Sequence, residues 1–348
     1  MLSASIAEYC KYSGNKIALV AKPKLSDLLS GRLYRPLAEN TLSPVFHENP
    51  YLHDVSNERS TFTIPLSNSV DTLFEKTINR LSLRDAFDNY LQKKCFHHAK
   101  STGVRYLYKD DIRFSYAESV DDTKMIWRDS PNAVAATLSG FLDPERPPIK
   151  HPQIKPAFYG LETERPYVEK LLAKHNLNNN DFIVLEPSTN AEWFSNLRAW
   201  MPARWQLLVN QLKESYPGLS IVRIGVPDTL VLDGVIDIRG TTTFRQAALL
   251  MQSCRLFIGT EGGLMHAARA VEAKAVILWG GLTDPSFAGY PDSHMILHSP
   301  VACAPCGLLG NCPHDVKCMK NISTENTYKA VTDALGSYRP GIIEVSKN

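Results

Sequence analysis

The chain has 348 residues, more than a single hydrophobic core usually supports, and this length predicts about two domains. Hydrophobic residues make up 44% of the chain and charged residues 21%, a composition that excludes an intrinsically disordered protein. The net charge of +2 excludes bulk electrostatic attraction to nucleic acid or to an anionic membrane. Any anion-binding site must therefore be local.

The sequence predicts a protein without an integral membrane segment. No stretch reaches the roughly 18 consecutive apolar residues of a membrane-spanning helix. Residues 1–16 lack the apolar core of a signal peptide, so we expect a cytoplasmic location.

The first half of the chain has weak structural signals. Residues 16–21 form an apolar run typical of a buried strand, and residues 61–66 alternate weakly between apolar and polar. Apolar residues recur at helical spacing over residues 70–94, which predicts one or two amphipathic helices. The proline-rich stretch over residues 142–156 can sustain neither a helix nor an inner strand and predicts a linker.

The second half alternates between strand and helix patterns. Short apolar runs predict strands, and longer periodic segments predict helices, one of which begins at Pro202 and is ended by Pro217-Gly218. Such alternation implies a parallel sheet covered on both faces, that is, a Rossmann-like α/β fold. The predicted strands are residues 182–185, 220–224, 256–258 and 275–279, and the predicted helices are residues 165–175, 202–216, 244–252 and 264–271.

A glycine pair joins a predicted strand to a predicted helix. Gly262 and Gly263 permit backbone conformations and a close approach that other residues forbid, and the free N–H groups of a helix start favour a phosphate. Glu261 could accept hydrogen bonds from sugar hydroxyls, and His266 in the first helical turn could donate one. The alternative is a tight turn between core elements, with a capping carboxylate and a structural histidine.

A second polar loop also follows a predicted strand. Ser188 and Thr189 can donate hydrogen bonds to phosphate oxygens, and Arg198 offers a planar fork for bidentate contact. This chemistry suits the diphosphate of a nucleotide sugar. The alternative is a polar surface loop whose arginine is solvated.

Four of the seven cysteines, Cys303, Cys306, Cys312 and Cys318, lie within sixteen residues. Four soft ligands with no open position predict one structural zinc or iron ion, with His314 as a substitute ligand. The alternatives are four reduced cysteines in a small-residue loop, or a zinc ribbon that contacts nucleic acid. Because few basic residues flank the cluster, we expect no nucleic-acid partner.

Four segments carry a resemblance to a known family. They lie between about residues 180 and 320 and read LEPSTNAEWFSNLRAWMPARW, DIRGTTTFRQAALLMQSC, FIGTEGGLMHAARAV and CAPCGLLGNCPHDVKCM. In this order they resemble glycosyltransferase family 9, the ADP-heptose heptosyltransferases. The resemblance implies an α/β fold of GT-B architecture, with two Rossmann-like domains facing across a cleft. We expect an acceptor-side domain over residues 1–160 and a donor domain with the four-cysteine loop over residues 161–348.

The resemblance also implies roles for individual residues in the donor domain. Glu261 stands where the family usually has aspartate. The residues expected to line the site of the donor diphosphate are Ser188, Thr189, Arg198, Gly262, Gly263 and His266. The residues expected near the ribose and the adenine edge are Asp228 and Thr242.

Asp27 is the expected general base of the acceptor-side domain. It follows Ser26 in a loop after the first strand, where the family normally carries Gly-Asp. A carboxylate there would take the proton of the acceptor hydroxyl. The alternative is that Asp27 caps a turn.

The expected reaction is transfer of a heptose from ADP-heptose to an acceptor hydroxyl, with inversion and without a catalytic metal. The acceptor would be the lipopolysaccharide core or a related glycan; the alternative is a serine of an autotransporter-type protein. An alternative of another class is a catalytically silent nucleotide-sugar-binding or scaffold protein. The resemblance further implies a bacterial cytoplasmic location with transient contact at the inner membrane surface, and it is compatible with an oligomer.

Overall fold

The computed structural model describes residues 10–11, 13–21, 35–36, 48–50, 52, 104–108, 117–121, 124–127, 155–188, 195–308 and 310–346. The chain divides into two compact units, of which one comprises residues 1–115 and 132–154 and the other residues 116–131 and 155–348. The predicted strand at 61–66, the predicted helices at 70–94 and most of the predicted linker lie outside the described residues. The division into an acceptor-side and a donor domain at residue 160 stays a prediction.

The described strands of the first unit form one small sheet. β1 (Lys16–Ala21) pairs in parallel with β3 (Val104–Tyr108) and antiparallel with β2 (Arg35–Pro36). Within it, Ile17 and Ala18 are fully inaccessible to solvent, whereas Lys16 is exposed. The strand predicted at residues 16–21 is therefore confirmed.

The second unit contains a seven-stranded sheet whose described pairings are all parallel. Its strand order is β12-β11-β10-β9-β6-β7-β8. The strands are β6 (Phe182–Glu186), β7 (Ser220–Arg223), β8 (Ile236–Asp237), β9 (Leu256–Thr260), β10 (Ala275–Trp279), β11 (His294–His298) and β12 (Gly341–Glu344). The same unit includes the antiparallel hairpin of β4 (Ala117–Asp121) and β5 (Lys124–Trp127).

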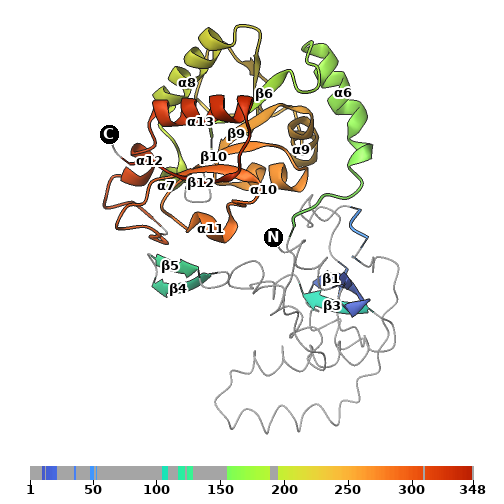
Figure 1. Cartoon of the computed structure of the whole chain (residues 1–348). Coiled ribbons are helices and arrows are strands. Elements are labelled where there is room, and N and C mark those ends of the chain that lie inside the picture. Colours follow the sequence, from blue (N-terminus) through green and yellow to red (C-terminus); the bar gives the residue numbers. More distant parts are fainter. Residues whose placement is uncertain are drawn as a thin grey trace, which may run out of the picture. The chain divides into compact units, whose positions relative to one another are not determined.

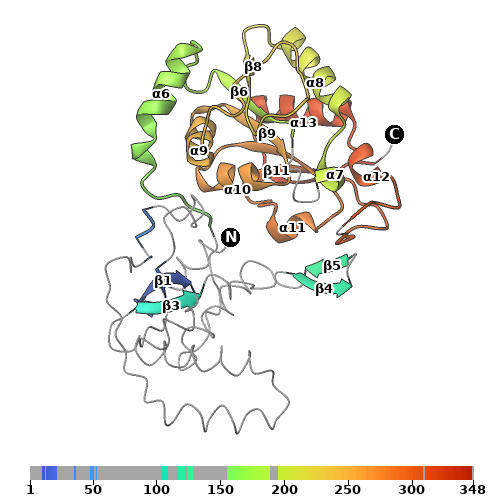
Figure 2. The ribbon, with the colours of Figure 1, turned by 180° about the vertical axis from the view of Figure 1, so that it is seen from behind.

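Helices cover both faces of this sheet (Figures 1 and 2). One face carries α6 (Arg165–Lys174), α9 (Phe244–Ser253) and α10 (Gly263–Ala270), and the other carries α8 (Pro202–Ser215) and α13 (Thr324–Gly336). The described short helices are the 3-10 helix η4 (Leu161–Thr163), α7 (Ser195–Arg198), α11 (Pro285–Ala288) and α12 (Lys317–Lys320). The expected α/β fold is confirmed, and the four predicted helices lie within about a residue of the observed bounds.

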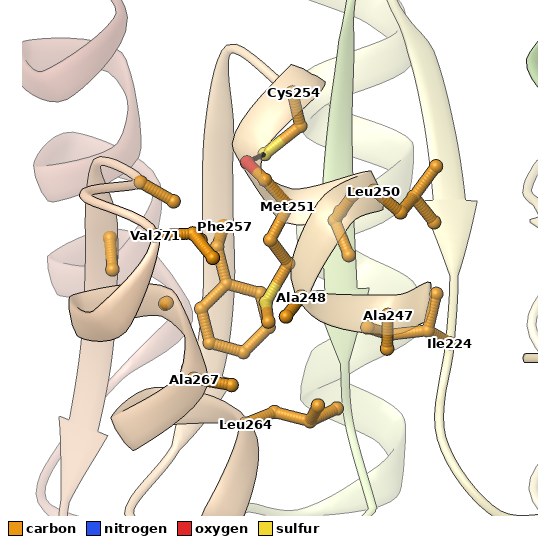
Figure 3. Close-up of a cluster of buried hydrophobic side chains, with 14 of the residues drawn as sticks. Ile224, Ala247, Ala248, Leu250, Met251, Cys254, Phe257, Leu264, Ala267 and Val271 are labelled. Atoms are coloured by element: carbon orange, nitrogen blue, oxygen red, sulfur yellow. Dashed lines mark hydrogen bonds between the residues drawn. The ribbon is translucent and has the colours of Figure 1, made fainter. Parts of the chain in front are cut away.

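Side chains of each inner strand alternate between two hydrophobic cores. Along β6, Phe182 and Val184 enter the core under α9 and α10, while Ile183 and Leu185 enter the core under α8 and α13. This alternation explains why the strand reads as a continuous apolar run. Figure 3 shows the first core, in which the ring of Phe257 lies among side chains of α9 and α10.

Within the described residues, no helix combines the length and the apolar character needed to cross a membrane.

Candidate nucleotide-sugar site

The two loops singled out in the sequence meet at the middle of the sheet. From β6 the chain proceeds outward to β7 and β8, then returns to place β9 against the other side of β6. The carboxyl ends of β6 and β9 therefore form the topological switch point, where open parallel sheets bind ligands. Residues 187–188 follow β6, and residues 261–262 connect β9 to α10, so the described parts of both loops lie at this edge.

The glycine pair opens α10 without a side-chain cap. Gly262 is the N-cap residue in an extended conformation with φ of 172°, so the expectation that its backbone conformation excludes other residues is wrong. An added Cβ at Gly262 would lie 3.9 Å from the Thr260 carbonyl oxygen, and one at Gly263 would lie 3.5 Å from the Phe244 ring. Both are ordinary contacts. The fold therefore has room for a side chain at either glycine. Such a side chain would, however, lie in the path of an anion that approaches the free N–H groups.

Arg198 reaches the glycine loop from α7. Its Nη1 donates a hydrogen bond of 3.1 Å to the carbonyl oxygen of Glu261. Leu197 on the same helix is buried, with 3% of its surface exposed. A guanidinium is thus positioned beside the start of α10, where it adds positive charge to that of the helix terminus.

Two carboxyl groups lie close to this arginine. Burial raises the pKa of Glu186 to about 8 and that of Glu261 to about 7, although the positive charge of Arg198 lowers both. The hydroxyl of Thr283 lies 3.4 Å from Oε1 of Glu261, while the buried Oε2 has no hydrogen-bond partner among the described residues. The carboxyl ends of β6 and β9 therefore place an arginine near carboxyl groups that resist ionisation.

Glu186 is a site residue that the sequence did not predict. The available signal was a carboxylate at the end of an otherwise apolar strand, a position that faces the ligand-binding edge of a parallel sheet.

His266 lies in the first turn of α10, as expected, and contacts a tyrosine that the sequence analysis missed. Its Nδ1 is 2.8 Å from the hydroxyl oxygen of Tyr290. Burial, with a further contribution from Arg198, lowers the pKa of His266 to about 3, so the ring is neutral at physiological pH. A neutral imidazole can still donate one hydrogen bond to a ligand.

Ser188 and Asp228 belong to an ion-pair network at the ends of β6, β7 and β8. The Ser188 hydroxyl donates to the Asp228 carboxylate, which also accepts hydrogen bonds from Arg223 at 2.8 and 2.9 Å and from Arg239 at 2.7 Å. Burial alone would raise the pKa of Asp228, but the hydrogen bonds from Ser188 and Arg223 outweigh it and lower the pKa. The carboxylate is thus largely occupied by protein donors.

The remaining predicted residues of the donor and acceptor sites are less informative. Thr242 is half-buried just before α9. Thr189 and Asp27 lie outside the described residues. Their expected roles stay predictions.

The four-cysteine loop contains free thiols. Cys306 is fixed by a backbone hydrogen bond of 2.8 Å from its N–H to the Gly281 carbonyl, and Cys318 lies buried on α12. Burial, followed by the neighbouring thiols of Cys312 and Cys303, raises the pKa of Cys306. Over the parts of the chain that the structure describes, no group of three or more His, Cys, Asp or Glu side chains is arranged to hold a metal ion.

A parallel α/β sheet with an arginine beside a helix start at its switch point is the arrangement that binds phosphate-bearing ligands in this fold class. Residues 173–311 match the sequence model described as glycosyltransferase family 9 (heptosyltransferase). This segment of the chain is therefore similar to the glycosyltransferases of that family.

Solved structures share the fold. The glycosyltransferase family 9 protein from Veillonella parvula DSM 2008 superposes with a TM-score of 0.52 at 15% identity, over 92% of this chain and 97% of that chain. The ADP-heptose lps heptosyltransferase II of E. coli superposes with a TM-score of 0.51 at 16% identity, over 96% of this chain and 94% of that chain. A search of curated proteins gives no match.

Proposed function

We propose that this chain transfers a heptose from ADP-heptose to an acceptor hydroxyl. The observation that carries the proposal is the position of Arg198 beside the uncapped start of α10, at the switch point of a glycosyltransferase family 9 domain. The family description and the E. coli structure named for ADP-heptose support this donor.

In the proposed mechanism the groups at the carboxyl ends of β6 and β9 stabilise the departing ADP. The acceptor oxygen attacks the anomeric carbon as the bond from that carbon to the β-phosphate oxygen breaks, which inverts the configuration. The positive charge of Arg198 and hydrogen bonds from the N–H groups of the first turn of α10 and from His266 would stabilise the charge that develops on the diphosphate. Because these groups are already positioned, the proposal requires no catalytic metal.

Asp27 is proposed as the base that takes the proton of the acceptor hydroxyl. The proposed acceptor is the lipopolysaccharide core or a related glycan, which the name of the E. coli enzyme supports. We place this reaction in the cytoplasm.

The four cysteines are proposed to hold one structural zinc or iron ion. The residue types support this proposal, because four thiolates without an open position are typical of structural sites, although the described side chains are not arranged around an ion. The metal would fix the loop over residues 303–318 and supply no catalytic group.

A transfer assay tests the proposal. Purified protein is incubated with ADP-heptose and a deacylated lipopolysaccharide core or a serine-containing autotransporter fragment, and ADP release and the acceptor mass are measured. We expect one added heptose on the glycan. Arg198→Gln should lower kcat/KM by two orders of magnitude or more, whereas Arg165→Gln, at an exposed ion pair with Glu162, should not. Donor binding without transfer to either acceptor would favour the silent alternative.

A further inference from the structure

Tyr290 is held in a constrained turn between α11 and β11. Its φ of 59° lies in the left-handed region, which is unfavourable for a bulky residue. The Tyr290 carbonyl accepts backbone hydrogen bonds from Ser293 at 2.9 Å and from His294 at 2.8 Å. An unfavourable backbone conformation that its surroundings enforce is characteristic of functional positions.

The residue before Tyr290 has to be glycine. A Cβ at Gly289 would lie 2.5 Å from the Pro285 carbonyl oxygen and 2.6 Å from Cδ1 of Ile296, both closer than real Cβ contacts. The chain is therefore closely packed at the residue that precedes Tyr290.

The side chain of Tyr290 lies between two histidines. Its ring meets the rings of His266 and His294 edge to face, each at a centroid distance of 5.6 Å, and it packs against the core beneath α10. His294 is fully buried and directs Nδ1 toward the Gly289 carbonyl oxygen at 3.2 Å. The short contact of 2.8 Å between the Tyr290 hydroxyl and Nδ1 of His266 is thus fixed by packing on several sides.

The direction of this hydrogen bond follows from the chemistry of the two groups. A phenol is a better proton donor than a neutral imidazole N–H, and a bare imidazole nitrogen is a better acceptor than a phenol oxygen. The hydroxyl therefore donates to Nδ1. Because a neutral imidazole carries one proton, that proton then lies on Nε2.

We propose that Tyr290 is a positioning residue of the donor site, which holds His266 in the tautomer with its proton on Nε2 so that the neutral ring donates a hydrogen bond to the diphosphate of the donor. The inference rests on the proposed function for the identity of the ligand. The tautomer itself is a property of the protein without ligand.

Nitrogen NMR of the full chain labelled with 15N-histidine tests the tautomer. The His266 signals are assigned by their loss in His266→Gln. In the wild type we expect Nδ1 without a proton and Nε2 with one. In Tyr290→Phe, which keeps the ring, this preference should be lost, and the Kd for ADP-heptose should rise roughly 3- to 10-fold. Tyr328→Phe removes a hydroxyl bonded to Ser215 and should change neither result.

The outcomes separate the inference from the proposed function. A proton on Nδ1 of His266 in the wild type overturns the inference, as does Tyr290→Phe with the wild-type tautomer and affinity. A wild-type protein with the expected tautomer that binds no ADP-heptose overturns the proposed function and the ligand named here. Because the wild-type spectrum tests the tautomer alone, the inference remains refutable even if Tyr290→Phe does not fold.

Discussion

Replacing Glu186 by glutamine should change how the stability of the protein depends on pH. In the unfolded chain this carboxyl has an ordinary pKa of about 4.5, whereas burial raises its pKa to about 8 in the folded protein. Above pH 4.5 the unfolded chain releases the proton while the folded protein keeps it. The folded state then binds more protons, so the free energy of unfolding falls as the pH rises toward 8 and levels off above it.

The size of this effect follows from the two pKa values. Each pKa unit corresponds to about 1.4 kcal/mol, so the full difference sets an upper bound of about 5 kcal/mol. The Glu186 side chain is only partly buried by surface area, and screening by water reduces the realised loss to roughly 1–2 kcal/mol. Glutamine does not titrate. We therefore expect the free energy of unfolding of Glu186→Gln to rise by this amount relative to that of the wild type as the pH increases from 5 to 8.5.

Urea unfolding followed by tryptophan fluorescence measures this difference, because Trp205 and Trp279 are fully buried in the second unit. The matched control is Glu162→Gln, at an exposed carboxylate whose pKa is lowered by a hydrogen bond from Arg165. The free energy of unfolding of this variant should depend on pH in the same way as that of the wild type over the same range. Parallel curves for the wild type and Glu186→Gln would refute the assignment of a buried, protonated carboxyl beside Arg198.

Three further predictions concern the glycine loop, the ion-pair network and the cysteines. Gly262→Ala should change the free energy of unfolding by less than about 0.5 kcal/mol, because the fold has room for the added Cβ. It should weaken donor binding at least about tenfold, because the Cβ occupies the path of the anion. Urea unfolding measures the first effect and a calorimetric titration the second. Arg223→Met should destabilise the protein by roughly 2–4 kcal/mol in urea unfolding, because a fully buried guanidinium paired with Asp228 is lost; an unchanged midpoint would contradict this. Cys306→Ser should lower the bound zinc or iron measured by elemental analysis, whereas Cys254→Ser, a buried thiol outside the cluster, should not.

The sequence predicted the parts of the fold that depend on local patterns. Strands such as residues 275–279 were found because both faces of an inner parallel strand are apolar. β8, with two residues, was missed because so short a segment has no periodicity, and β11, α13 and β12 were not predicted.

The site was predictable where residues adjoin a strand end and obscure where distant residues meet. The glycine loop and Arg198 were identified from such positions, and the structure brings them together. The contact of His266 with Tyr290 joins residues 24 positions apart, and no local pattern reports it. Arg223 and Asp228 are only five residues apart, yet their ion pair depends on the path of the backbone between them, which no sequence pattern reports.

Calorimetric titration of the purified protein with ADP-heptose tests the central claim most directly, with ADP, GDP-mannose and UDP-glucose as comparison ligands. The account predicts micromolar binding that is confined to the two adenine compounds and is weakened about 10- to 100-fold in Arg198→Gln. Equal affinity for all four ligands, or binding of ADP-heptose that is unchanged in Arg198→Gln, would contradict a donor site at the carboxyl ends of β6 and β9.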